Sequence, residues 1–130
     1  MEDIRTRIAI IDDDPSVRRA LKRFLCASKF DAESYGSGPE FLEAFRNFRP
    51  QCVILDLHME GMNGIAVQQR LQDISRDVPV IVVTGHDSLQ ARTSCLASGV
   101  SAFLAKPVDG KLLVATVQQL VGLPRSAPMA

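Results

Sequence analysis

The sequence has no excess of charge of either sign: fifteen Lys and Arg side chains are matched by fifteen Asp and Glu, so the formal net charge is zero. Because nucleic-acid-binding modules usually carry a basic excess, this balance argues against direct nucleic-acid binding. Long hydrophobic segments are also missing. No apolar run approaches the roughly 18 residues that span a membrane, and no apolar signal-peptide core follows the N-terminal Met-Glu-Asp-Ile-Arg. We expect a cytoplasmic protein without a membrane segment.

Cysteine is scarce as well. Cys26, Cys52 and Cys95 are an odd number, and their spacing is not that of a metal site. All three lie in apolar segments. We therefore predict that they are small, reduced residues of the hydrophobic core.

What the chain does contain is an ordinary globular composition, with 46% hydrophobic and 23% charged residues. Its 130 residues fit one domain with one hydrophobic core. We place this domain at residues 1–122 and predict a flexible C-terminal tail at 123–130, which contains Pro124 and Pro128.

Short apolar runs alternate with segments of helical periodicity. The predicted strands are Arg7–Ile11, Phe30–Tyr35, Cys52–Leu55, Val80–Val83 and Ala102–Ala105. A continuous β-branched run is typical of a strand buried on both faces. Right-handed crossovers between such strands produce a parallel sheet with helices on both sides. We predict an α/β fold with a doubly wound five-stranded parallel sheet, order 2-1-3-4-5, and five helices on two faces.

Local signals predict where the helices begin and end. Asp14 and Ser37 are expected N-caps, with Pro15 and Glu40 in the favoured following positions. Gly61 and Gly64 are expected to act as breakers of regular structure in the loop after the third strand. Asp87 or Ser88 is expected to cap the fourth helix, and Gly99 is expected to end it. The apolar helix faces predict buried side chains that include Phe24, Ile74 and Leu112.

Polar residues follow four of the five predicted strands. Asp12 and Asp13 follow the first, Asp56 the third, Thr84 the fourth and Lys106 the fifth. In a sheet of this kind, working residues lie at the carboxyl ends of the strands. With the order 2-1-3-4-5 these side chains meet in one shallow crevice.

This residue set suits phosphoryl transfer to a carboxylate. Three carboxylates in one pocket repel each other, and a divalent cation that prefers oxygen ligands relieves the repulsion. Mg²⁺ fits, with Mn²⁺ as an alternative. Asp56 is the candidate nucleophile that forms an aspartyl phosphate. Lys106 would offset the charge of the transferred group, and Thr84 offers a hydroxyl donor.

Four motifs carry a family resemblance: Ile-Ile-Asp12-Asp13-Asp14, Leu-Asp56-Leu-His-Met59-Glu-Gly-Met-Asn-Gly64, Val-Thr84-Gly85 and Lys106-Pro107. In this order and at these spacings, they resemble the receiver domain of two-component response regulators, which has a CheY-like (flavodoxin-like) fold. The resemblance covers roughly residues 6–122. The segments Ser-Gly-Pro-Glu-Phe-Leu and Leu-Asp-Leu-His-Met are most similar to receivers of the FixJ/LuxR-type group.

The resemblance implies a role for each matching residue. Asp12, Asp13 and Asp56 would bind the metal together with the backbone carbonyl of His58, and Asp56 would accept the phosphoryl group from a sensor histidine kinase or phosphotransfer protein. Thr84 and Phe103 would be switch residues, Lys106 would contact the phosphoryl group, and Pro107 would follow a cis peptide bond. Phosphorylation would then alter a surface formed by the fourth helix, the fifth strand and the fifth helix.

The sequence departs from the family pattern next to Met59, where the usual proline is replaced by Glu60. Histidines occur two residues after both Asp56 and Thr84. For His58 and His86 we favour exposed loop histidines over tuning of the phosphate lifetime. The basic run Arg18, Arg19, Lys22 and Arg23 is interpreted as either a solvated helix face or a docking surface for the kinase.

Other functions remain alternatives. A phosphatase of the haloacid-dehalogenase type requires Asp-x-Asp, whereas this chain has Asp56-Leu57-His58; we therefore expect no enzyme, and at most slow self-dephosphorylation. Three aspartates after the first strand argue against flavin phosphate binding. A receiver-like binding module without phosphorylation stays open because of Glu60, and so does a receiver cut from a DNA-binding transcriptional regulator. The expected partners are a downstream protein target or output domain, with the chain a monomer or a phosphorylation-promoted homodimer.

Overall fold

Strands and helices alternate along the whole described chain. The computed structural model describes residues 5–59, 61–85 and 89–122. The strands are β1 (Arg7–Ile11), β2 (Asp31–Tyr35), β3 (Cys52–Asp56), β4 (Val80–Thr84) and β5 (Ala102–Ala105). The helices are α1 (Pro15–Ala27), α2 (Gly38–Phe48), α3 (Gly64–Ile74), α4 (Leu89–Ala97) and α5 (Gly110–Val121).

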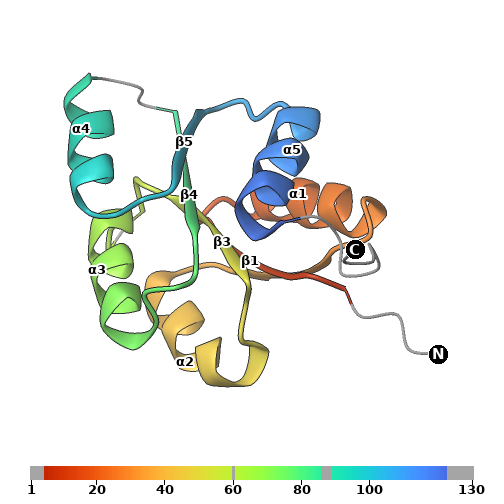
Figure 1. Ribbon diagram of the computed structural model, residues 1–130, viewed down its shortest axis with the longest axis horizontal. Coiled ribbons are helices and arrows are strands. Elements are labelled where there is room, and N and C mark those ends of the chain that lie inside the picture. The colour runs from red at the N-terminus through yellow and green to blue at the C-terminus, as the bar shows by residue number, and fades with distance from the viewer. Residues whose placement is uncertain (1–4, 60, 86–88, 123–130) are drawn as a thin grey trace, which may run out of the picture.

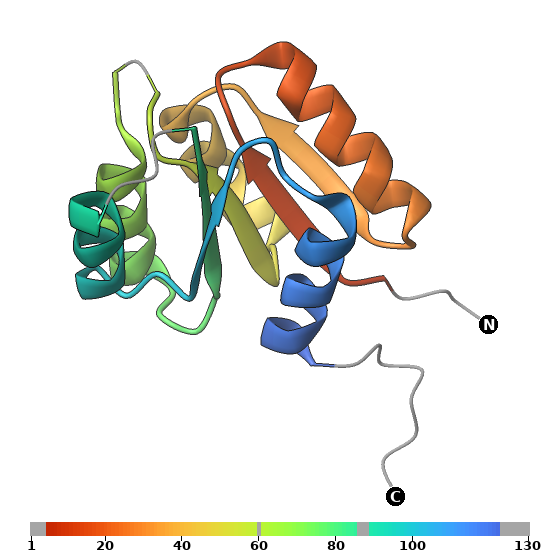
Figure 2. The same ribbon diagram turned by 90° about the horizontal axis from the view of Figure 1, so that it is seen from above.

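The five strands form one parallel sheet in the order β2-β1-β3-β4-β5, which confirms the predicted fold class. Helices α1 and α5 cover one face of the sheet, and α2, α3 and α4 cover the other (Figures 1 and 2). Within the described residues, no helix has the length and hydrophobicity needed to cross a membrane.

The core has two layers because successive side chains of a strand point to opposite faces of a sheet. In β1, Ile8 and Ile10 pack with the side chains of α1 and α5, whereas Ala9 and Ile11 pack with those of α2, α3 and α4. All four are fully buried. The continuous β-branched runs of the sequence therefore correspond to strands covered on both sides.

Most of the predicted helix boundaries are confirmed. The Asp14 carboxylate accepts a hydrogen bond from the Ser16 amide (2.9 Å), and the Ser37 hydroxyl accepts one from the Glu40 amide (3.3 Å). Gly99 follows α4 with φ +89°, a left-handed conformation that glycine adopts readily. The expected caps Asp87 and Ser88 lie outside the described residues, as does the predicted tail.

The boundary at Gly64 was wrong: Gly64 is the first residue of α3 rather than a loop breaker. Gly61, with φ +80°, does lie in the loop as expected. A Cβ atom on Gly64 would lie 2.7 Å from the Asp56 carbonyl oxygen and 2.8 Å from the Leu57 Cα. Glycine is therefore needed here for close approach of the helix to the end of β3.

Several predicted core residues are more exposed than their pattern indicates. Cys52 and Cys95 are buried as predicted, and burial raises the pKa of the Cys52 thiol to about 12. Cys26 is exposed, because it follows the buried Leu25 in α1 and a one-residue step turns a helical side chain by about 100°. Phe24, Ile74 and Leu112 are 38%, 50% and 52% exposed, since they lie at the margins of the apolar helix faces.

Candidate functional site

The register of the sheet brings the predicted site residues to one edge. Ile11 pairs with Leu55, so Asp12 leaves β1 beside Asp56 at the end of β3. Thr84 pairs with Ala105 at the other side, so Lys106 leaves β5 just beyond Thr84. Residues that are 94 positions apart in the chain thereby come into contact.

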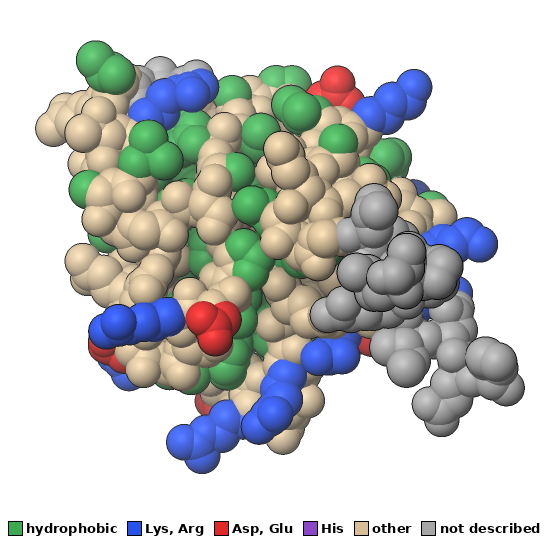
Figure 3. All heavy atoms as spheres, viewed as in Figure 1, with side chains coloured by type: hydrophobic (Ala, Val, Ile, Leu, Met, Phe, Trp, Pro, Cys, Tyr) green, Lys and Arg blue, Asp and Glu red, His purple; other side chains and the backbone are tan. Residues whose placement is uncertain are grey.

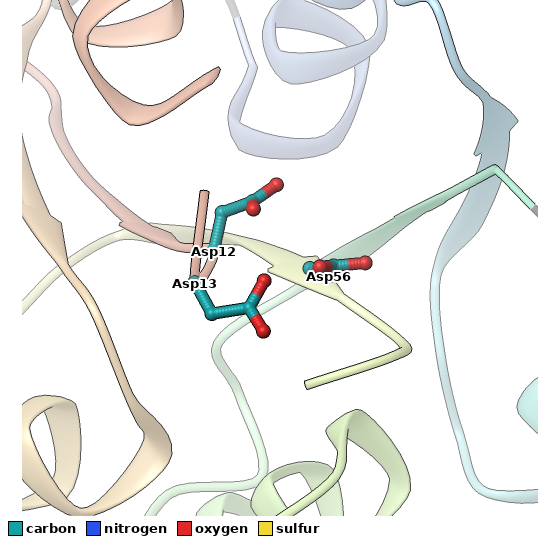
Figure 4. Close-up of side chains that lie close together, drawn as sticks. All are labelled: Asp12, Asp13 and Asp56. Carbon is teal, nitrogen blue, oxygen red and sulfur yellow. The ribbon is translucent and has the colours of Figure 1, made fainter. Parts of the chain in front are cut away.

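Three carboxylates form the centre of this site. One carboxylate oxygen from each of Asp12, Asp13 and Asp56 lies within 4.8 Å of the others, at the ends of β1 and β3 (Figure 4). Asp12 and Asp56 are buried, with 2% and 5% exposure, whereas Asp13 is exposed. The group therefore combines two desolvated carboxylates with one that is open to solvent, an all-oxygen set able to hold a metal ion.

Lys106 is the cation that balances this group. Its Nζ donates a hydrogen bond to Asp12 Oδ2 (2.9 Å) and lies 3.6 Å from Asp56 Oδ2. The other oxygen of Asp12 accepts a hydrogen bond from the Asp14 amide (2.9 Å). The peptide bond between Lys106 and Pro107 is cis, as predicted.

The charges of the site act on each other. Burial raises the pKa of the Asp56 carboxyl, and the charge of Asp12 raises it further, while Lys106 and the His58 amide oppose the shift. Desolvation lowers the pKa of Lys106, but the hydrogen bond to Asp12 and the charge of Asp56 outweigh it and raise this pKa overall. Without a bound cation, one lysine faces three carboxylates, so the site keeps an excess of negative charge.

The remaining candidate residues, Thr84 and Phe103, belong to β4 and β5. Thr84 is fully buried at the end of β4. Phe103 is partly buried, as expected, and the Arg92 guanidinium carbon lies 4.9 Å from its ring centre. This cation–π contact joins α4 to β5 and was not anticipated from the sequence.

Two residues that follow β3 in the sequence, His58 and Glu60, were singled out in the sequence analysis. His58 is exposed, and its amide donates to Asp56 Oδ1 (3.3 Å). Glu60 lies outside the described residues, as does His86 in the loop after β4, so the interpretations of these two side chains stay predictions.

The basic run of α1 is not uniform. Arg19 and Arg23 are exposed, whereas Arg18 is half-buried and its Nη1 donates to the Asp12 carbonyl oxygen (2.7 Å). The interpretation of all four basic residues as one outer surface was therefore wrong for Arg18. Helical spacing alone offered no signal for this contact, because its acceptor, the Asp12 carbonyl oxygen, belongs to the loop before the helix.

Residues 8–118 of the chain match the response regulator receiver domain family. The protein belongs to this family. The matched range contains Asp12, Asp13, Asp56, Thr84 and Lys106, which belong to the four motifs on which the resemblance was based.

Individual relatives agree with the family assignment. The receiver domain is 34% identical over 122 residues to response regulator MprA of Mycobacterium sp. (strain KMS), covering 94% of this chain and 52% of the relative. It is 32% identical over 126 residues to the DNA-binding transcriptional regulator NtrC of Klebsiella pneumoniae, covering 92% of this chain and 27% of the relative. The crystal structure of a response regulator receiver protein from Burkholderia phymatum is 41% identical with a TM-score of 0.82, covering 96% of this chain and all of that chain. The chain thus spans about half the length of MprA.

Replacing Lys106, the cation of this site, should lower the stability of the metal-free protein. We expect Lys106→Gln to lower the free energy of unfolding in EDTA by about 1–2 kcal/mol, because it leaves two buried carboxylates without their cation. Urea unfolding followed by circular dichroism measures the change. Lys22→Gln is the matched control, since the Lys22–Glu33 pair (3.3 Å) is exposed and should contribute no more than about 0.5 kcal/mol. Equal losses in the two variants would contradict the balancing role of Lys106.

Proposed function

We propose that this receiver domain accepts a phosphoryl group on Asp56 from the phosphohistidine of a sensor kinase or phosphotransfer protein, and that the modification alters its binding to a downstream protein. The observation that carries the proposal is the convergence of Asp12, Asp13 and Asp56 within 4.8 Å, with Lys106 Nζ 2.9 Å from Asp12 and 3.6 Å from Asp56. A carboxylate in such surroundings is oriented as a nucleophile and faces a cation that can offset incoming negative charge.

The donor set fits a resident magnesium ion. All of its side-chain ligands are carboxylate oxygens from Asp12, Asp13 and Asp56. Burial and then the charge of Asp12 raise the pKa of Asp56, and a bound cation would relieve the repulsion between the carboxylates. Neither a thiol nor an imidazole is among the three residues, which favours Mg²⁺ over a transition metal. Bound there, Mg²⁺ would supply positive charge that neutralises the oxygens of the transferred phosphoryl group.

The transfer step uses the ionised form of Asp56. A carboxylate oxygen of Asp56 forms the new P–O bond while the P–N bond to the donor imidazole breaks, and the released imidazole nitrogen takes a proton from solvent. Lys106 then lies within reach of both the product phosphate and Asp12. Position 58 is occupied by His58 and not by a second acidic residue, so the chain lacks the Asp-x-Asp pattern of phosphatases of the haloacid-dehalogenase type. We therefore propose slow loss of the phosphate rather than turnover as an enzyme.

The surface around β5 suits a protein partner. Hydrophobic side chains are visible between α4 and α5, while Lys and Arg lie mainly at the periphery of this face (Figure 3). Leu89 and Leu96 of α4 and Leu112 of α5 are 80%, 60% and 52% exposed. The Arg92–Phe103 contact connects α4 to β5, the strand that ends just before Lys106. We propose that phosphorylation shifts the population of two arrangements of α4, β5 and α5.

The output of the switch is proposed from the longer relatives. NtrC is described as a DNA-binding transcriptional regulator, and this chain covers 27% of its length. We propose that the phosphorylated surface controls either an output domain of that kind or a separate protein target, without direct contact between the receiver domain and nucleic acid. The zero net charge of the chain supports this proposal, because nucleic-acid-binding domains usually carry an excess of basic residues.

Metal removal tests the proposed chemistry. In acetyl phosphate and Mg²⁺, the protein is expected to gain one phosphoryl group by intact mass, and excess EDTA should slow the gain at least about a hundredfold. Hydroxylamine should remove the group, because it cleaves acyl phosphates and leaves phosphate esters intact.

Two results would contradict the proposal. A gain that is independent of Mg²⁺, or that resists hydroxylamine, would show modification of some other group. No gain from acetyl phosphate or from a panel of histidine kinases, with folding verified by circular dichroism, would favour a binding module that works without phosphorylation.

A further inference from the structure

Asp13 differs from the other two carboxylates in how it is held. The Asp12 carboxylate accepts hydrogen bonds from Lys106 Nζ and the Asp14 amide, both at 2.9 Å, and the Asp56 carboxylate accepts one from the His58 amide at 3.3 Å. Within the described part of the chain, the Asp13 side chain has no such bond and is exposed. The direction of its carboxylate therefore depends on the backbone that carries it.

Both peptide groups next to the Asp13 Cα are fixed by side chains. The amide of Asp14, on the C-terminal side, donates to Asp12 Oδ1. On the N-terminal side, the carbonyl oxygen of Asp12 accepts a hydrogen bond from Arg18 Nη1 at 2.7 Å. A guanidinium donor makes such a bond shorter and stronger than a neutral one.

The structure provides room for this guanidinium. Arg18 lies in the first half of α1 and folds back toward the loop that carries the aspartates. A Cβ atom on Gly36 would lie 3.1 Å from Arg18 Nη1, which is tighter than nine in ten real Cβ contacts. A side chain at position 36 would therefore force the guanidinium to shift by a few tenths of an ångström from its position against the Asp12 carbonyl oxygen.

We infer that Arg18 is a positioning residue for the metal site, acting on Asp13 through the peptide group between Asp12 and Asp13. This inference rests on the magnesium site of the proposed function. Among the described residues, no ion pair joins Arg18 to a carboxylate. Arg18 therefore orients Asp13 through the backbone, and the Asp13 carboxylate has no hydrogen bond of its own in that part of the chain. Outer residues that orient metal ligands typically change metal affinity by 10–100-fold when they are replaced.

The test measures metal binding without any phosphodonor. Mg²⁺ that binds only the folded state stabilises it by RT ln(1 + [Mg²⁺]/Kd), so the rise in unfolding temperature during a titration gives Kd, the Mg²⁺ concentration that half-saturates the folded protein. We expect this concentration to rise about tenfold in Arg18→Gln and to change less than twofold in Arg19→Gln. The two variants remove the same charge from adjacent positions of one helix, and Arg19 is exposed.

Two further variants separate position from charge. Arg18→Lys keeps the charge and a single donor, and should recover part of the affinity. Gly36→Ala keeps Arg18 but displaces its guanidinium by a few tenths of an ångström, and should raise the half-saturating Mg²⁺ concentration in the same direction by a smaller factor. In the metal-free proteins, hydrogen exchange of the Asp13 and Asp14 amides should be faster in Arg18→Gln than in Arg19→Gln.

Equal shifts in Arg18→Gln and Arg19→Gln would overturn the inference, because charge alone would explain both. An unchanged Mg²⁺ response in Gly36→Ala would overturn it as well, as would a wild-type protein that does not respond to Mg²⁺. If Arg18→Gln does not fold, Arg18→Lys and Gly36→Ala decide the question. A wild-type protein that binds Mg²⁺ but gains no phosphoryl group would contradict the proposed function and leave the role of Arg18 intact.

Discussion

Asp56→Asn is expected to abolish phosphoryl transfer to the receiver domain and, without divalent metal, to make the protein more stable. The amide has no carboxylate oxygen to attack phosphorus, so no mass gain should follow incubation with acetyl phosphate and Mg²⁺. The same change removes a charge from a side chain that is 5% exposed and lies beside Asp12. The free energy of unfolding in EDTA should rise by on the order of 1 kcal/mol, or ~4 °C in melting temperature.

The gain in stability should depend on pH with a definite sign. Burial and the charge of Asp12 raise the folded-state pKa of Asp56 above its unfolded value, so ionisation of Asp56 weakens the folded protein. This cost is fully present above the folded-state pKa, decreases as the pH falls below it, and vanishes only below the unfolded-state pKa, where both states are protonated. The difference between Asp56→Asn and wild type should be largest near neutral pH and should shrink toward about pH 4.

Thermal unfolding of both proteins across this pH range, in EDTA and in Mg²⁺, measures the effect. Mg²⁺ should reduce or reverse the difference, because it binds the wild-type carboxylates more tightly. Asp73→Asn is the matched control: it removes one charge from an exposed position of α3 and should leave stability and phosphorylation nearly unchanged. If Asp56→Asn still gains a phosphoryl group, the phosphoacceptor is another residue and the assignment of Asp56 is wrong.

Gly64→Ala is expected to destabilise the protein although alanine is the better helix former. In an ordinary helix position this substitution would stabilise by up to about 1 kcal/mol. Here the new Cβ would lie 2.7 Å from the Asp56 carbonyl oxygen and 2.8 Å from the Leu57 Cα, and backbone atoms cannot rotate away as a side chain can. We expect a loss of about 2–3 kcal/mol in the free energy of unfolding, the cost of overpacking a close contact.

The same clash should slow phosphorylation, because it displaces the backbone of Asp56, the residue that supplies the nucleophile. A displacement of about 1 Å at a reacting group can reduce a rate roughly a hundredfold. Urea unfolding and the rate of mass gain test the two effects. Gly85→Ala is the stability control, since a Cβ there meets no atom within 4 Å, and its effect should stay within about 0.5 kcal/mol. Unchanged stability in Gly64→Ala would mean that α3 can move away from β3 at no cost.

The fold and the centre of the site were both predictable from local patterns. A strand covered on both faces must be apolar at every position, so β1, β3 and β4 appear as continuous β-branched runs. Parallel strands place their carboxyl ends at one edge of the sheet, so the polar residues that follow them converge whatever their distance in the chain. The position of Asp12, Asp56 and Lys106 after predicted strands was therefore enough to group them.

Contacts made by long side chains were not predictable in this way. Arg18 and Arg19 are adjacent and chemically identical, yet only Arg18 reaches the Asp12 carbonyl oxygen. Gln68 has a polar side chain in α3 but is 1% exposed, and its amide nitrogen donates to the Ser98 carbonyl oxygen (3.0 Å) beyond α4. Composition cannot distinguish such residues from solvated ones, because their partners belong to loops whose course depends on the whole fold.

Periodicity and strand-end position are local properties of the chain, and they were enough to predict the parallel sheet, its helical layers and the acidic site. Tertiary structure alone decided that Cys26 faces solvent, that Gly64 begins a helix against the end of β3, and that Arg18 supports the peptide before Asp13. These features depend on distances between segments that meet only after the sheet has formed, and a pattern along the chain contains no such distances.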